Sequence, residues 1–155
     1  MDPPEKVGAG LLFVCQDDCL LLRRAATSGN PNSLGLPGGN ADPEDNGDLL
    51  VTAIREATEE MGAPPPHTVL HSFLTHRGKR QQKHYTVFLA EVTPDARAAW
   101  QPQLNEEHTA WEWVSLKTIH LRQDLHPVVK LVLLEEPRKS QVGAVLAEKN
   151  RVKVN

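Results

Sequence analysis

The fold is decided by two stretches, Leu36-Pro37-Gly38-Gly39 and Arg55-Glu56-Ala57-Thr58-Glu59-Glu60-Met61-Gly62. Apolar residues recur at helical spacing through the second stretch and in front of it, which predicts an amphipathic helix over residues 49–61. Asp48 or Asn46 could cap the start of this helix. A glycine ends it, and three prolines soon afterwards prevent its continuation.

The helix carries three glutamates that project from one side. Glu56, Glu59 and Glu60 stand at positions i, i+3 and i+4. Like charges this close repel each other, so the helix gains nothing from them unless a cation offsets the charge. Carboxylate oxygens suit magnesium or manganese better than zinc. A solvated acidic helix face would produce the same spacing, so the glutamates alone leave both interpretations open.

Two glycines, Gly38 and Gly39, precede the helix by a short loop, where the backbone can approach a ligand closely. On their own they indicate only a turn. Together with the helix, they resemble the Nudix box, whose pattern is glycine, five residues, glutamate, seven residues, Arg-Glu, an aliphatic, any residue, Glu-Glu, any residue, glycine. The second half of the box is matched without a gap over residues 55–62.

The first half of the box differs from the family pattern. About two extra residues separate Gly39 from Arg55. Asp45 keeps the spacing from Gly39, whereas Asp48 falls one place short of the spacing from Arg55. The family's first box glutamate therefore has no clean counterpart here, and we expect Asp45 and Asp48 to matter less than the helix glutamates.

The resemblance implies roles for individual residues. Glu56, Glu59 and Glu60 are expected to bind the metal, and Arg55 to orient these carboxylates by charged hydrogen bonds. The backbone carbonyl of Gly38 is expected to join the metal ligands. Replacing Glu59 or Glu60 by glutamine should then lower kcat by a factor on the order of 10².

Further site residues are expected outside the box. The family often supplies another metal ligand or base from the loop before the strand at residues 111–114, where Glu107 is the preferred candidate and Glu106 the next. Both could also be ordinary loop acids. For binding substrate phosphate the resemblance favours Arg23 and Arg24 at a strand end, together with Gly38 and Gly39.

Residue direction limits these assignments. Arg23 and Arg24 are strand neighbours, so only one is expected to face the substrate. Tyr85 and Phe88 lie on opposite faces of their strand, and one of them could line the pocket. The basic residues at the tip of the following hairpin, namely Arg77, Lys79, Arg80 and Lys83, are most simply a solvated turn, and the alternative is that they steer an anionic ligand or RNA.

Strand and helix signals alternate along the chain. With the resemblance, this predicts an α/β (α+β) fold, a Nudix-like α/β/α sandwich with a mixed central sheet. A single domain is expected over residues 1–140, and residues 141–155, with weak periodicity, as a loosely ordered C-terminal tail. The predicted elements are strands over residues 7–15, 20–24, 69–76, 84–92 and 111–114, a brief strand over residues 34–36, and a second helix over residues 128–135.

Composition excludes some classes of protein. The net charge of -3 over 155 residues argues against a dedicated nucleic-acid binder, and no apolar run is long enough to span a bilayer. If Asp17-Asp18 forms a hairpin turn, Cys15 and Cys19 point to opposite sheet faces, which opposes a disulfide. We therefore expect a reducing, cytoplasmic setting and no membrane partner.

The resemblance implies a magnesium-dependent hydrolase, with manganese as a possible substitute, that cleaves a phosphoanhydride bond in a small nucleotide-like substrate. A nucleoside triphosphate, or an oxidised one, would give the monophosphate and pyrophosphate. Coenzyme A, ADP-ribose, dinucleoside polyphosphates and an RNA cap are alternatives, and a homodimer is a compatible assembly. In another class, the chain would be a nucleotide-binding module without catalysis.

Overall fold

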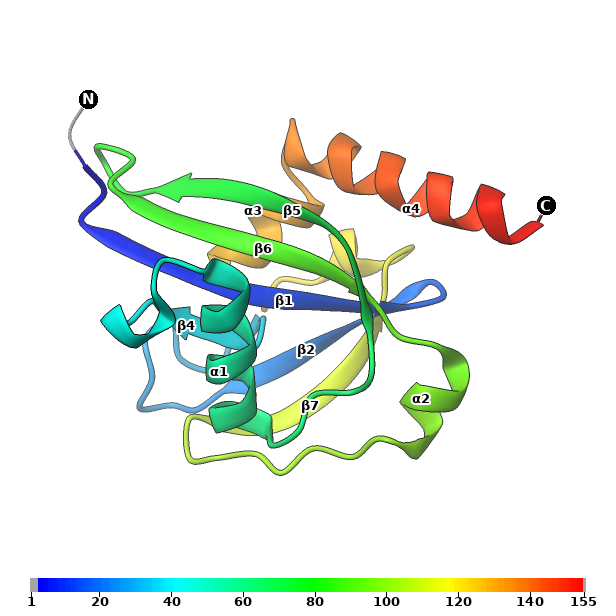
Figure 1. Cartoon of the computed structure of the whole chain (residues 1–155), viewed down its shortest axis with the longest axis horizontal. Helices are drawn as coiled ribbons and strands as arrows, with labels where there is room; N and C mark the ends of the chain where they lie inside the picture. Colours follow the sequence, from blue (N-terminus) through cyan, green and yellow to red (C-terminus); the bar gives the residue numbers. More distant parts are fainter. Residues whose placement is uncertain (1–2, 155) are drawn as a thin grey trace.

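A seven-stranded mixed sheet forms the centre of the molecule (Figure 1), seen here in a computed structural model that describes residues 3–154. The main path runs β3-β2-β1-β6-β5, while β4 pairs with β1 and β7 pairs with β2. β1 and β6 are parallel, and the other pairs are antiparallel. The strands are β1 (Lys6–Cys15), β2 (Asp18–Arg24), β3 (Leu34–Gly35), β4 (Gly38–Asn40), β5 (Thr68–Arg77), β6 (Lys83–Glu91) and β7 (His108–Ser115).

Helices cover both faces of this sheet, which confirms the predicted α/β/α sandwich (Figure 1). Leu11 and Phe13 of β1 pack on the side of α1, in a cluster with Ala53 and Ala57. Leu12, also on β1, packs with α3 residues on the other side. The helices are α1 (Leu49–Met61), α2 (Pro94–Ala99), α3 (Pro127–Leu133) and α4 (Arg138–Val154), with short 3-10 turns η1 (Pro43–Asp45) and η2 (Ile119–Leu121).

Helix α1 is the predicted helix, with the same bounds. The Asp48 carboxylate caps its start by accepting hydrogen bonds from the Leu50 and Val51 N–H groups at 3.0 and 3.3 Å. Gly62 ends it with a positive φ of 75°. Both ends of the helix that carries the glutamates are therefore capped.

On one of its edges, β1 pairs with two different strands along its length. Its last residues pair with β2 through Val14↔Cys19 and Cys15↔Asp18. Its earlier part pairs with β4 instead, from Gly8↔Asn40 to Gly10↔Gly38. The short strand β4, which the sequence pattern did not predict, thereby carries Gly38 and Gly39 up to the carboxylates of α1.

The hairpin between β1 and β2 turns one position earlier than expected. Cys15 pairs with Asp18, so the turn residues are Gln16 and Asp17 and not Asp17 and Asp18. Cys15 and Cys19 are nevertheless buried in different core clusters, and both are free thiols. The expectation that they face opposite sides of the sheet is confirmed.

Residues 141–154, which were expected to form a loosely ordered tail, are helical in the structure. They belong to α4, in which Val142 is buried and Arg138 donates a hydrogen bond from Nε to the Leu74 carbonyl at 2.8 Å. Most of this helix faces solvent, so few apolar positions mark it in the sequence. No helix in the described residues is long and apolar enough to cross a membrane.

Candidate active site

Glu60 is the most buried acid on α1. Its side chain is 4% exposed, and its Oε1 accepts a hydrogen bond from the Gly38 N–H at 2.7 Å. Glu56, one turn earlier, lies against Gly39, where an added Cβ would stand 2.5 Å from the Glu56 Cδ. The two glycines of β4 therefore let the backbone run directly along the carboxylates, and the Gly38 amide holds Glu60 in place.

Burial changes the proton affinity of these acids. It raises the pKa of Glu60 to about 8, and the Gly38 hydrogen bond only partly opposes this. Burial also raises the pKa of Glu56, while the hydrogen bond from Arg55 lowers it. Burial disfavours the ionised form of these carboxylates, and a bound cation favours it. A cation at this place would therefore offset the effect of burial.

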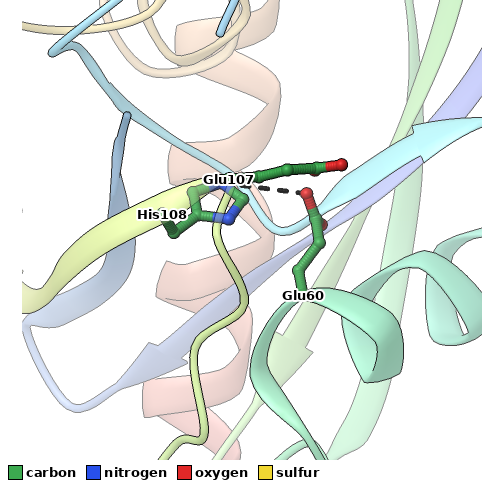
Figure 2. Close-up of side chains that lie close together, drawn as sticks. All are labelled: Glu60, Glu107 and His108. Atoms are coloured by element: carbon green, nitrogen blue, oxygen red, sulfur yellow. Dashed lines mark ion pairs between the residues drawn. The ribbon is translucent and has the colours of Figure 1, made fainter. Parts of the chain in front are cut away.

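Glu107, in the loop before β7, and His108, the first residue of β7, lie next to Glu60 (Figure 2). The ligand atoms of Glu60, Glu107 and His108 all lie within 4.8 Å of one another. His108 Nε2 is 3.7 Å from Glu60 Oε2, and the His108 side chain is 1% exposed. The structure thus brings the predicted Glu107 to the helix glutamates. The adjacent Glu106 is outside this cluster.

His108 has no hydrogen-bond partner for either ring nitrogen within the described part of the chain, although both are buried. Burial, with a smaller effect from Arg24, lowers its pKa to about 4, so the ring is neutral near pH 7. A neutral imidazole nitrogen is an available metal ligand. Together with the oxygens of Glu60 and Glu107, this unpartnered nitrogen fits a divalent cation.

Arg55 connects the glutamates to the loop before the helix, as the resemblance implied. Its Nη1 donates to Glu56 Oε1 at 3.1 Å and to Glu59 Oε1 at 3.3 Å. Its Nε and Nη2 donate to Asp45, which is 2% exposed and also accepts a hydrogen bond from the Thr52 hydroxyl at 2.7 Å. Asp45 is therefore part of the site, a role that sequence reasoning had not given it.

Glu59 differs from its neighbours. Its side chain is 56% exposed, and it does not line the cavity next to Glu56 and Glu60. Its Oε1 accepts a hydrogen bond from Arg55 Nη1 at 3.3 Å. The structure therefore places Glu59 at the rim of the glutamate group.

A cavity of about 550 Å³ lies beside these residues. Arg24 faces it, whereas the neighbouring Arg23 points away and pairs with Asp124 at 3.0 Å. One of the two arginines faces the cavity, as the alternation of strand residues predicts. The lining residues are Lys6, Arg24, Gly29, Asn30, Leu36, Gly38, Gly39, Asn40, Glu56, Glu60, Arg77, Lys83, Tyr85, Glu107, His126 and Val128.

The basic residues of the hairpin tip fall into two groups, those that line this cavity and those that do not. Arg77 and Lys83 line it, and Lys79 and Arg80 do not. The expectation of a wholly solvated turn is therefore wrong for the first pair, because the strand ends carry them over the site. Tyr85 also lines the cavity, while Phe88 packs in the core on the α1 side.

Comparison with known proteins places this chain in a family. A model of the NUDIX domain matches residues 4–134. An Ap4A hydrolase from C. elegans has a similar structure, with a TM-score of 0.64, 23% identity and coverage of 92% of this chain and 98% of that chain. RenU, a Nudix hydrolase from M. smegmatis, gives a TM-score of 0.69 at 21% identity, covering 94% of this chain and 88% of that one.

A third structure is the NUDIX domain of Shewanella oneidensis NrtR complexed with ADP ribose, with a TM-score of 0.61, 17% identity and coverage of 94% of this chain and 90% of that chain. At these identities the structures show a shared fold. The match to the family model extends over most of the chain and includes every element from β1 to α3. The chain therefore belongs to the Nudix family and is a pyrophosphohydrolase of that family.

Proposed function

We propose that the enzyme is a magnesium-dependent hydrolase of nucleoside triphosphates, including oxidised ones, that releases the monophosphate and pyrophosphate. The observation that carries this proposal is the convergence of three acids on one cavity with Arg24. Glu56 and Glu60 come from α1, and Glu107 comes from the loop before β7. Acids beside a cation at a polar cavity suit a substrate that is itself a polyanion bound through a divalent ion.

Residues of the cavity would hold the metal ion. Glu56, Glu60 and Glu107 would hold the metal, with the His108 nitrogen beside them. When bound, magnesium neutralises phosphate charge and makes a coordinated water more acidic. The Gly38 N–H holds one oxygen of Glu60.

Arg55 contacts the helix acids, and Arg24 lines the cavity. Arg55 keeps Glu56 and Glu59 oriented through Nη1. The Arg24 Nε is held by the Gly29 carbonyl at 2.6 Å, which leaves its other nitrogens to donate to phosphate oxygens. In the reaction, the oxygen of water bonds to one phosphorus, while the bridging oxygen leaves with the other phosphate group and takes up a proton.

The test is a substrate panel with magnesium that reads phosphate and pyrophosphate release together. ADP-ribose and a dinucleoside tetraphosphate are the comparison substrates, because similar structures bind or are named for such linkages. We expect pyrophosphate from nucleoside triphosphates and loss of turnover in excess chelator. Full turnover without free metal would overturn the proposal, and nucleotide binding without turnover would favour a non-catalytic module.

A matched pair of variants tests the role of Arg24. Arg24→Ala removes the cation that faces the cavity, whereas Arg23→Ala removes its neighbour, which pairs with Asp124 outside the cavity. We expect KM for the triphosphate to rise about 10-fold or more in Arg24→Ala, the usual effect of losing a charged hydrogen bond. Equal effects of the two substitutions would contradict this assignment.

A further inference from the structure

Three basic residues stand side by side at one end of the cavity. Lys83 on β6 is the parallel partner of Lys6 on β1 and the antiparallel partner of Arg77 on β5. Directly paired residues on neighbouring strands share one face of the sheet. All three residues line the cavity of about 550 Å³ that holds the glutamates. We refer to Lys6, Lys83 and Arg77 as the cation row.

The cation row has no anionic partner of its own. Among residues 3–151, whose side chains the structure describes, no carboxylate forms an ion pair with any of the three. The Arg77 Nε is buried and has no hydrogen-bond partner there. Burial also lowers the pKa of Arg77. Like charges directly opposite each other destabilise a sheet, so this arrangement needs a compensating reason.

The other basic residues of the hairpin are arranged differently. Arg80 forms an ion pair with Glu5, and neither Arg80 nor Lys79 lines the cavity. Arg77 and Lys83 are therefore the basic residues of the hairpin that line the cavity, and in the described part of the chain neither forms an ion pair with a carboxylate.

Tyr85 connects the cation row to the glutamates. It follows Lys83 by two residues on the same face of β6, a separation of about 7 Å along a strand. Its hydroxyl lies beside Gly38, since a Cβ added to Gly38 would stand 2.2 Å from the Tyr85 Oη. The Gly38 N–H in turn binds Glu60. The row and the acids are thus two ends of one continuous surface.

We propose that Lys6, Lys83 and Arg77 form an anion subsite that binds the outer phosphates of the substrate, the ones that leave as pyrophosphate. This inference rests on the proposed function and narrows it. The subsite selects nucleoside triphosphates over nucleoside diphosphates linked to an uncharged group, because only the former bring further phosphate charge to the row.

Binding of inorganic tripolyphosphate tests the subsite without turnover. Isothermal titration calorimetry compares the wild type with Arg77→Ala, Lys83→Ala and the matched control Lys79→Ala. We expect tripolyphosphate affinity to fall about 10-fold or more in the first two variants, as for loss of a hydrogen bond to a charged group, and to be unchanged in the control. Unchanged affinity in both Arg77→Ala and Lys83→Ala would overturn the proposal.

Substrate selectivity gives the second readout. The kcat/KM for ATP should fall in Arg77→Ala and Lys83→Ala, while that for ADP-ribose stays within about 2-fold of the wild type, because the uncharged ribose does not reach the row with a phosphate. Equal losses on both substrates would contradict selection by charge. If the wild type released no pyrophosphate from any triphosphate, the proposed function would fail, but the calorimetry would still decide the anion subsite.

Thermal melting separates binding from folding. Relief of the like-charge contact should leave the melting temperature of Arg77→Ala without ligand equal to or above that of the wild type. Arg77→Lys keeps the charge and should retain most of the tripolyphosphate affinity. If Arg77→Ala does not fold, Arg77→Lys and Lys83→Ala still test the proposal. If Arg77→Lys lost as much tripolyphosphate affinity as Lys83→Ala, the result would contradict a role for charge.

Discussion

Asp45 holds the guanidinium of Arg55 at two points, with Oδ1 3.0 Å from Nε and Oδ2 2.9 Å from Nη2. Two parallel charged hydrogen bonds fix an arginine in orientation as well as in position. The remaining Arg55 nitrogen, Nη1, donates to Glu56 and Glu59. A buried aspartate in the loop therefore sets the position of the arginine, and the arginine sets the position of the helix glutamates.

Replacing Asp45 by asparagine should impair catalysis although the two residues have nearly the same shape. The amide carries no charge, and its NH2 group cannot accept a hydrogen bond from Arg55. We expect kcat to fall about 10- to 100-fold, the usual effect of removing a partner that orients metal ligands. The melting temperature should fall as well, because Asp45 is buried. Steady-state kinetics at saturating magnesium and thermal melting measure both effects.

Asp48→Asn is the matched control. Asp48 accepts hydrogen bonds from the first turn of α1, and asparagine caps helices about as well as aspartate. Activity and melting temperature should stay near the wild-type values. If both substitutions had equally small effects, Arg55 would not depend on Asp45.

The same ion pair predicts a response to acid. The hydrogen bond from Arg55 is the main cause that holds the pKa of Asp45 well below its usual range. The contribution of Asp45 to stability is therefore complete above about pH 4, the ordinary value for an aspartate, and is lost as the pH falls further. Between pH 5 and pH 2, the melting temperature should fall more steeply for the wild type than for Asp45→Asn. Parallel curves would contradict this account.

Sequence reasoning expected Asp45 and Asp48 to matter less than the helix glutamates, and it did not predict that Asp45 contacts Arg55. The extra residues of the box loop are taken up by a 3-10 turn that ends at Asp45 and by Asn46 and Gly47, whose φ values are 54° and 76°. Asp48 then starts the helix. Loop conformations of this kind have no periodicity that a sequence pattern can reveal, so spacing alone did not show which aspartate reaches Arg55.

Other features followed from sequence because they depend on local periodicity. The bounds of α1 and the common side of Glu56 and Glu60 are of this type. The cation row is of the opposite type, because Lys6 and Lys83 meet only through the parallel register of β1 and β6. Such register between distant strands is set by tertiary packing.

The raised pKa of Glu60 predicts how the metal-free protein responds to alkali. Burial raises this pKa to about 8, whereas a glutamate in an unfolded chain titrates near 4.3. Between about pH 4 and pH 8 the unfolded chain has lost this proton and the folded chain keeps it, so stability falls as the pH rises. In the presence of chelator, the melting temperature should therefore decrease over this range.

Glu60→Gln tests the assignment of this effect. Glutamine cannot ionise, so its melting temperature in chelator should depend less on pH than that of the wild type. Magnesium should raise the melting temperature of the wild type at pH 8 more than that of the variant, because binding to the folded state adds stability. The same pH slope in both proteins would assign the effect to another group.

Glu59→Gln and Glu60→Gln compare an exposed acid with a buried one. If both bind the metal, as the family resemblance implies, each should lower kcat by a factor on the order of 10². The Glu59 side chain is 56% exposed, so Glu59→Gln should melt near the wild-type temperature. Wild-type kcat in Glu59→Gln would restrict the metal ligands to the acids that line the cavity.

Gly39→Ala tests whether the close approach of β4 to α1 positions Glu56. The added methyl group would stand 2.5 Å from both Cδ and Oε2 of Glu56, so this carboxylate must move. The tip of a glutamate is flexible, and the fold should survive. A displacement of about 1 Å at a reacting site can lower the rate on the order of 10²-fold, and we expect a loss of this size in kcat together with weaker magnesium binding by calorimetry.

Gly143→Ala is the control for the change from glycine to alanine. Gly143 lies in α4, and an added Cβ there meets nothing within 4 Å. Alanine should stabilise this helix by about 1 kcal/mol and leave activity unchanged. The comparison turns on Gly39→Ala: a protein that melts like the wild type but has lost kcat and magnesium affinity places Glu56 among the metal ligands. If it instead keeps full kcat, the position that Glu56 takes beside Gly39 is not needed for the reaction.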